Sequence, residues 1–218
     1  MGELVFISQV LEDRSRPAHG RAAFFFALDC PLSYLAAERV ERALGEIEWV
    51  PVLTHGFDGG PATPASERVR GAQRRLALAE QEARTLDLPL VEPHSYPFET
   101  RPISRAAAYA AERGVGARFA LAALRLAFCG CYDLSNPEVI GEAGAVVGLR
   151  ARDAILASGA PEFDLRLDAT SRGLLTRGIS APAIRVGKQW FEGVDAVVGA
   201  AMVRAADVDG EAPPLHAG

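Results

Sequence analysis

The sequence predicts an α/β protein in which a block of helices separates the two halves of a small β-sheet. Near its start, an apolar run at 23–28 precedes a helix-like stretch at 33–44 and a second apolar run at 47–53. Near its end, two short strand candidates, 183–186 and 189–192, precede a last helix. Nearly every segment between the two halves has helical character. The order of elements is therefore β-α-β, a set of helices, and β-β-α.

The first half has the pattern of a β-α-β unit. The run 23–28 is continuously apolar, as in a strand that is buried on both faces. In the following stretch five apolar residues can share one helical face: Leu35, Ala36, Val40, Ala43 and Leu44. Gly45 separates this helix from the second strand, and the glycine- and proline-rich segment 55–64 predicts a loop after that strand.

The segment 65–177 predicts several helices with four breaks between them: 88–101, 113–115, 133–136 and 149–150. Asn136-Pro137-Glu138 has the pattern of an N-cap, a proline at the first helical position and an acid in the first turn. Gly178 follows a helix that starts near Pro161, as glycine commonly does after a helix end. The middle of the chain is therefore expected to be an all-helical insertion.

The second half is expected to be a hairpin and a helix. Gly187-Lys188 lies between the last two strand candidates and favours a tight turn, and the final helix is expected at 194–205. At 218 residues the chain is long enough for one domain that carries an insertion. We divide it into five parts: an N-terminal extension at 1–21, the first half at 22–64, the helical insertion at 65–178, the second half at 179–205 and a disordered tail at 206–218.

The composition argues against several classes of function. The net charge of −5 and the lack of a basic block give nucleic acid no electrostatic reason to bind, and the acidic balance argues against anionic membranes. No window approaches the ~18–20 consecutive apolar residues of a membrane span, and the N-terminus lacks a leader pattern. Three cysteines make a secreted disulfide framework unexpected. We therefore expect a cytoplasmic protein whose cysteines remain thiols.

Cys30 lies at the junction between the first strand and the first helix, in the segment Cys30-Pro31-Leu32-Ser33. The first N–H groups of a helix have no intrahelical partner and carry the positive end of the helix dipole, so they favour a negative sulfur. Pro31 suits this turn because it has no N–H to leave unpaired. We therefore expect a functional thiol with a lowered pKa, rather than a cysteine that is merely buried after a core strand.

Two kinds of thiol chemistry are compatible with this segment. A Cys30 thiolate could attack a disulfide and form a mixed disulfide, but Ser33 cannot resolve that intermediate because its hydroxyl gives no S–S product. Alternatively, Cys30 and Ser33 could hold the thiolate of a bound cofactor by hydrogen bonds. That external sulfur would then be the nucleophile toward an unsaturated or aromatic substrate. The residues alone leave both kinds of chemistry open.

Several segments together carry a family resemblance. They are 26–35, which contains the Cys-x-x-Ser site, then Pro97-Phe98, 135–138, 177–182 and 191–195. In order and spacing they resemble the DsbA superfamily, and within it the branch of 2-hydroxychromene-2-carboxylate isomerase and the kappa-class glutathione transferases. The likeness spans about residues 22 to 205. It implies an α/β thioredoxin-like fold with an all-helical insertion domain, as in DsbA.

The resemblance also implies a thiol-based enzyme. Cys30 falls where the isomerase and kappa enzymes carry a serine that holds the glutathione thiolate, and where DsbA-like oxidants carry their attacking cysteine. Ser33 falls where a dithiol oxidant carries its resolving cysteine. The favoured function is a thiol-dependent isomerase or transferase. The alternatives are a monothiol disulfide oxidoreductase of the DsbA type and a non-catalytic thioredoxin-like binding module.

Further site residues are implied by the same resemblance. Pro182 matches the cis-proline of the thioredoxin fold and is expected to face Cys30, while the backbone of Ala181 would pair with a substrate peptide or with glutathione. Val194 and Asp195 match the position that kappa enzymes use to hold the γ-glutamyl end of glutathione. The implied cofactor is glutathione or another low-molecular-weight thiol, without a metal. The implied partner is a small-molecule or thiol/disulfide substrate, and a homodimer is left open.

The remaining candidate motifs are weaker. Cys129-Gly130-Cys131 could be a second redox pair or half of a metal site, but a single intervening residue disfavours an easy disulfide. We therefore expect the two cysteines to serve as small apolar residues near a helix end. His55 and His94 lie in loops and are expected to be solvated, although either could act as a general base. The opposite charges at 67–84 are expected to form a solvated helix face.

Overall fold

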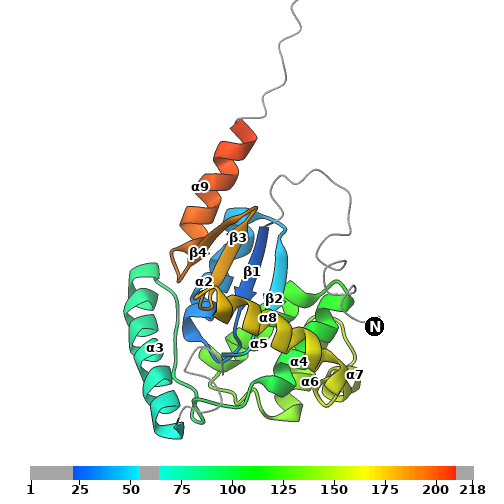
Figure 1. Cartoon of the computed structure of the whole chain (residues 1–218). Helices are drawn as coiled ribbons and strands as arrows, with labels where there is room; N and C mark the ends of the chain where they lie inside the picture. Colours follow the sequence, from blue (N-terminus) through cyan, green and yellow to red (C-terminus); the bar gives the residue numbers. More distant parts are fainter. Residues whose placement is uncertain (1–21, 55–63, 210–218) are drawn as a thin grey trace, which may run out of the picture.

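The computed structural model describes residues 22–54 and 64–209 (Figure 1). The expected N-terminal extension at 1–21 lies outside these residues, as do 55–63 and 210–218. The described elements follow the predicted order. They are β1 (Ala22–Phe26), α2 (Pro31–Leu44), β2 (Glu48–Pro51), α3 (Ala65–Leu86), α4 (Arg101–Glu112), α5 (Gly116–Phe128), α6 (Pro137–Val146), α7 (Ala151–Ser158), the 3-10 turn η2 (Pro161–Phe163), α8 (Asp164–Thr176), β3 (Ala183–Val186), β4 (Gln189–Glu192) and α9 (Ala196–Asp209).

The sheet has the strand order β2-β1-β3-β4. Strand β1 runs parallel to β2 and antiparallel to β3, and β3 and β4 form an antiparallel hairpin. All five residues of β1 are buried, which explains its uninterrupted apolar sequence. Phe24 of β1 pairs with Trp49 of β2, and their rings meet edge to face with centroids 4.9 Å apart. Gly187 has a φ of 57° in the predicted tight turn, a conformation that glycine adopts readily.

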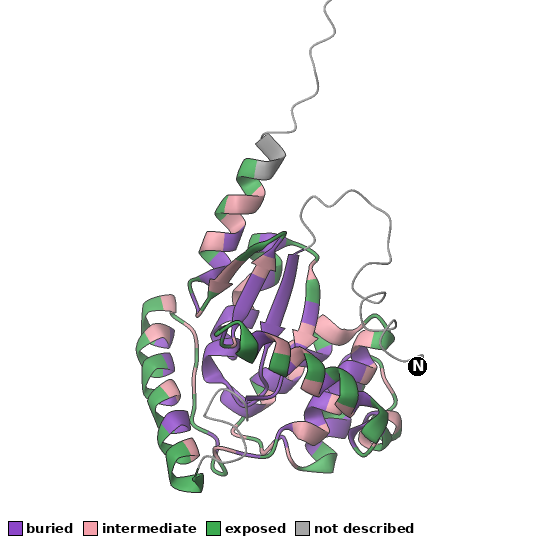
Figure 2. Ribbon diagram, viewed as in Figure 1, coloured by how far each residue is buried: buried purple, intermediate pink, exposed green. Residues whose placement is uncertain are grey.

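Helices pack around the sheet and turn their exposed residues outward (Figure 2). Helix α2 contacts α9, α3 and α5, while α9 also contacts β3 and β4. From the helical insertion, α4 and α5 contact β2. The buried face of α5 combines aromatic, branched and small residues at helical spacing: Phe119, Ala120, Ala123, Leu124, Ala127 and Phe128. None of the described helices is long and apolar enough to cross a membrane.

Most predicted boundaries agree with the structure to within a few residues. The hairpin strands have the predicted ends, and Asn136 caps α6 by accepting a hydrogen bond from the N–H of Glu138 at 2.9 Å. Helix α2 begins at Pro31 rather than at residue 33, because proline is well suited to a first helical turn. Helix α9 continues to Asp209, so the tail expected from residue 206 begins inside a helix.

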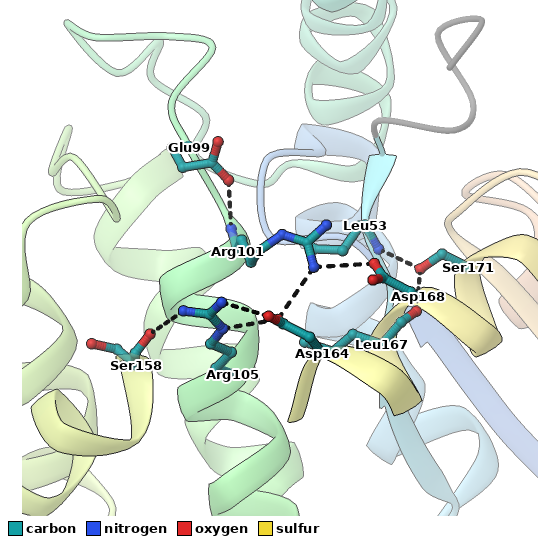
Figure 3. Close-up of polar contacts among 9 residues, drawn as sticks. All are labelled: Leu53, Glu99, Arg101, Arg105, Ser158, Asp164, Leu167, Asp168 and Ser171. Atoms are coloured by element: carbon teal, nitrogen blue, oxygen red, sulfur yellow. Dashed lines mark hydrogen bonds and ion pairs between the residues drawn. The ribbon is translucent and has the colours of Figure 1, made fainter. Parts of the chain in front are cut away.

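A group of ion pairs joins α4 to α8 (Figure 3). Arg105 binds Asp164 through two hydrogen bonds, from Nε at 2.8 Å and from Nη2 at 2.6 Å. Arg101 contacts both Asp164 and Asp168, at 3.2 Å and 3.1 Å. The hydrogen bonds from Arg105, followed by those from Arg101, lower the pKa of Asp164 to about 2 despite its partial burial. These charges therefore hold α8 against α4.

Asp164→Asn should destabilise the fold by about 1–2 kcal/mol near neutral pH, because two arginines lose their shared carboxylate. An unfolded aspartate has a pKa of ~3.9. Asp164 therefore contributes its full share to the free energy of unfolding above this unfolded pKa, and the contribution is lost as the pH falls toward about 2. Urea denaturation of the wild type and the variant should show that the difference in free energy of unfolding shrinks over this range.

Asp153→Asn is the matched control for this prediction, because Asp153 pairs with an arginine whose side chain is 85% exposed. An exposed ion pair of this kind should contribute little to the free energy of unfolding. Two results would contradict the stabilising role of the Asp164 ion pairs. One is an equal loss of stability in the two variants, and the other is a loss for Asp164→Asn that stays constant with pH.

Candidate active site

Cys30 occupies the N-cap position of α2, directly after the turn that follows β1. Its φ of −109° and ψ of 109° are those of extended backbone, and Pro31 stands in the first helical turn. The Cys30 N–H donates to the carbonyl of Ala27 at 3.2 Å, which closes the preceding turn. The residue is 0% exposed. The predicted strand-to-helix junction therefore holds a fully enclosed thiol.

Ala181 lies beside Cys30 and is followed by the cis-proline that the sequence predicts. The Ala181–Pro182 peptide bond is cis. The Sγ atom of Cys30 lies 3.8 Å from the carbonyl oxygen of Ala181, although the two residues are 151 positions apart in the sequence. The thiol is thus covered by the segment that leads into β3.

Val194 and Asp195 lie between β4 and α9. The N–H of the preceding residue, Gly193, donates to the carbonyl of Pro182 at 2.9 Å, which holds this segment beside the cis-proline. Val194 is buried, whereas Asp195 is exposed. Of these two predicted residues, Asp195 is therefore the one whose side chain is open to solvent.

Ser33 stands in the first turn of α2 and is also completely buried. Its hydroxyl oxygen accepts a hydrogen bond from the N–H of Ala27 at 3.1 Å, which leaves the hydroxyl proton available for donation. Hydrogen bonds from the backbone and the hydroxyl of Ser33 act on the Cys30 sulfur and lower its pKa. Ser33 therefore connects the turn after β1 to the thiol.

Burial has the largest influence on the Cys30 thiol, and it raises the pKa above the ordinary value of a cysteine. The lowered pKa expected from the helix start is therefore wrong. The charge of Arg75 and the hydrogen bonds from Ser33 favour the thiolate, but they act on a sulfur from which water is excluded, and the charge of Asp29 opposes them. The thiol consequently stays protonated near neutral pH.

Asp29, Thr54 and Tyr96 are site residues that the sequence does not indicate by pattern. Asp29 is only 6% exposed, and its Oδ2 atom accepts a hydrogen bond from the Thr54 hydroxyl at 2.5 Å. The Tyr96 hydroxyl donates to the Asp29 carbonyl at 3.1 Å. Burial, followed by the charges of Asp29 and Cys30, raises the pKa of Tyr96 and keeps its hydroxyl protonated. The sequence signal for Asp29 is its place directly before Cys30, because an aspartate is rarely buried unless it is paired.

Arg75 is a further site residue, contributed by α3. Its side chain is half-buried, and its charge acts on both Cys30 and Tyr96. The solvated face predicted for this segment does not extend to Arg75. The signal that identifies it is helical spacing, because Arg75 lies three residues after Ala72 and four before Ala79, and both alanines are buried.

The weaker sequence candidates occupy loops and a helix end. His94 is exposed in the loop between α3 and α4, and His55 lies outside the described residues. Cys129 and Cys131 are free thiols at the expected helix end, just after α5, and Cys129 is exposed. Within the part of the chain that the structure describes, no group of three or more His, Cys, Asp or Glu side chains is arranged to hold a metal ion.

The fold is similar to several solved structures, although no protein-family model and no curated protein sequence matches the chain. A 2-hydroxychromene-2-carboxylate isomerase superposes with a TM-score of 0.71 at 16% identity, over 87% of this chain and 98% of its own. A probable DsbA oxidoreductase from Streptomyces coelicolor superposes with a TM-score of 0.67 at 18% identity, over 91% of this chain and 94% of its own. The oxidoreductase DsbA from Xylella fastidiosa superposes with a TM-score of 0.53 at 13% identity, over 89% of this chain and 88% of its own. These similarities confirm the predicted DsbA-like thioredoxin fold with a helical insertion.

Two opposite charges beside the thiol predict opposite changes in the pKa of Cys30. Asp29→Asn removes a negative charge and should lower this pKa, whereas Arg75→Gln removes a positive charge and should raise it. The measurement is the rate of iodoacetamide alkylation against pH, followed in the tryptic peptide 22–39 that contains Cys30. Arg74→Gln, on the exposed side of the same helix, should leave the inflection unchanged. A wild-type inflection below ~8.5, the value of a free cysteine, would contradict this account.

Proposed function

We propose that the chain is a thiol-dependent isomerase or transferase in which Cys30 donates a hydrogen bond to the sulfur of a bound low-molecular-weight thiol. The observation that carries this proposal is the complete burial of Cys30, which keeps its thiol protonated. A protonated thiol is a weak nucleophile but can donate a hydrogen bond. The attacking sulfur is therefore assigned to the cofactor and not to the protein.

The groups around Cys30 suit a thiol cofactor such as glutathione. The S–H of Cys30 and the O–H of Ser33 are two donors at the N-terminal end of α2, where the helix dipole favours a negative sulfur. The backbone at Ala181, 3.8 Å from the Cys30 sulfur, offers a main-chain carbonyl to a peptide-like ligand. Asp195 offers an exposed carboxylate to the ammonium group of a γ-glutamyl end. When bound, the cofactor supplies the thiolate for addition to an unsaturated carbon of the substrate.

The substrate class we propose is an unsaturated carboxylate. One of the similar folds belongs to an isomerase named for 2-hydroxychromene-2-carboxylate. In this chain Arg75 contributes a positive charge beside Cys30, which suits an anionic substrate. The raised pKa of Tyr96 keeps its hydroxyl as a donor in the same region. These residues would bind and orient the substrate next to the cofactor sulfur.

A monothiol disulfide oxidoreductase of the DsbA type is the second candidate function. It is supported by the cis-proline segment that faces Cys30 and by the DsbA oxidoreductases among the similar folds. In this function Cys30 itself attacks a disulfide, which requires the thiolate that burial disfavours. A non-catalytic module, which binds a peptide or a small acid through the same groups, is the third candidate.

Cys30→Ser and Cys30→Ala should separate these functions. As a hydrogen-bond donor, Cys30 can be replaced by serine, so Cys30→Ser should keep much of the glutathione-dependent isomerisation of 2-hydroxychromene-2-carboxylate. Cys30→Ala removes the donor and should lower kcat/KM by about 10²–10³. As an attacking sulfur, Cys30 can be replaced by neither residue, because a hydroxyl forms no S–S bond. Absorbance changes of the substrate follow isomerisation, and insulin reduction follows disulfide exchange.

The control for these variants is Lys188→Gln, in the exposed hairpin turn, which should leave both activities unchanged. Equal loss of isomerisation in the serine and alanine variants would overturn the hydrogen-bonding role of Cys30. Insulin reduction by the wild type without isomerisation would favour the oxidoreductase. Binding of glutathione or a peptide without turnover in either assay would favour the binding module.

A further inference from the structure

We propose that Cys129 and Cys131 form a second redox centre, in which a low-molecular-weight disulfide oxidises two thiols one residue apart to an intramolecular disulfide. This centre uses different residues from the thiol-dependent reaction proposed above and does not depend on it. Three observations carry the inference: the shape of the turn, the exposure of its thiols and the contact of Cys129 with α2.

The two cysteines lie in a tight turn at the C-terminal end of α5. The N–H of Gly130 donates to the carbonyl of Arg125 at 3.0 Å, and the N–H of Tyr132 donates to the carbonyl of Leu126 at 3.0 Å. These bonds fold the segment back over the last turn of the helix. Cys131 has a φ of 60°, a left-handed conformation that is uncommon for a residue other than glycine. Such backbone conformations gather at functional sites.

The shape of this turn permits a bond between the two sulfurs. Consecutive Cα atoms are about 3.8 Å apart, so two residues separated by one position in a bent chain fall within the Cα separation of ~4.4–6.8 Å that disulfides use. A Cβ atom at Gly130 would lie 2.7 Å from the ring of Tyr132 and 2.9 Å from the carbonyl oxygen of Leu126, so a larger residue there would displace its neighbours. The turn therefore keeps the two cysteines close and excludes a side chain between them.

The thiols of this turn can be reached from solution. Cys129 is exposed and Cys131 is partly exposed, whereas Cys30 is buried. The Sγ atom of Cys129 lies 3.2 Å from the hydroxyl of Tyr34, which stands on α2 four residues after Cys30. Burial raises the pKa of Tyr34, so its hydroxyl stays protonated beside the Cys129 sulfur. This contact holds the Cys129 sulfur against α2, the helix that begins beside the buried thiol.

The reaction is a thiol–disulfide exchange in two steps. The deprotonated sulfur of Cys129 attacks one sulfur of the disulfide RSSR, forming a Cys129–SR bond and releasing RS⁻, which takes up a proton. The deprotonated sulfur of Cys131 then attacks the sulfur of Cys129, forming the Cys129–Cys131 bond and releasing the second RS⁻, which is likewise protonated. Two electrons pass from the dithiol to RSSR, which becomes two RSH molecules.

The test uses the Cys30→Ala protein, which keeps only the two thiols of this turn. The folded protein is incubated with oxidised glutathione, quenched with acid and digested with trypsin, which places both cysteines in the peptide 126–150. We expect this peptide to lose two hydrogen atoms and to carry no glutathione. With Cys131→Ser added, Cys129 should instead hold one glutathione, because no second thiol remains to displace it.

The turn geometry is tested by repeating the incubation with the same protein unfolded in urea, where less of the peptide should form the disulfide. Two unmodified thiols, or glutathione retained on the Cys30→Ala protein, would overturn the proposal. Equal disulfide formation in the folded and unfolded protein would also overturn it, because the turn would then contribute nothing. Circular dichroism of each variant verifies that it is folded. Since Cys30 is absent from every sample, the result is independent of the isomerase assays.

Discussion

The antiparallel pairing of β1 with β3 is the constraint on which the site depends. Because β1 ends where β3 begins, Cys30, which follows β1, and Pro182, which precedes β3, must lie at the same edge of the sheet. Strand β2 runs parallel to β1 and ends at this edge too, which brings Thr54 to Asp29. One edge of a small sheet therefore collects residues that are far apart in the sequence.

The burial of the Cys30 thiol decides its chemistry. A helix N-terminus stabilises a nearby negative charge by only ~0.3–2 kcal/mol. Full burial can shift a pKa by ~3–5 units, or ~4–7 kcal/mol against the charged form. With the Cys30 residue completely buried, the second effect exceeds the first and the pKa rises. A protonated thiol at a helix start is better suited to holding another sulfur than to attacking one, and this is why we favour the isomerase or transferase over the oxidoreductase.

The helical insertion supports this edge of the sheet as well as covering it. The N–H of Leu53 donates to the hydroxyl oxygen of Ser171 in α8 at 2.9 Å, and that hydroxyl donates to the carbonyl of Leu167 at 2.7 Å (Figure 3). Leu53 directly precedes Thr54, so α8 fixes the backbone that presents the Thr54 hydroxyl to Asp29. The ion pairs between α4 and α8 hold α8 itself in place. Helix α3 adds the charge of Arg75. The insertion thus supplies both the support and part of the electrostatics of the site.

The sequence by itself determined the order of the elements and the place of Cys30 among them. Apolar periodicity, the glycine at the hairpin turn and the proline after Cys30 are local signals, and each acts within a few residues of the structure that it specifies. The DsbA-like order of motifs also indicated the cis bond before Pro182.

The tertiary structure alone decided the environment of the thiol. The burial of Cys30, the charge of Arg75 on α3 and the Asp29–Thr54 hydrogen bond all depend on segments that are far apart in the sequence. One such contact joins the Cys30 sulfur to the carbonyl oxygen of Ala181, 151 residues further along the chain. A local pattern can place the cysteine at a helix start, but the solvent exposure that sets its pKa is a property of the assembled fold.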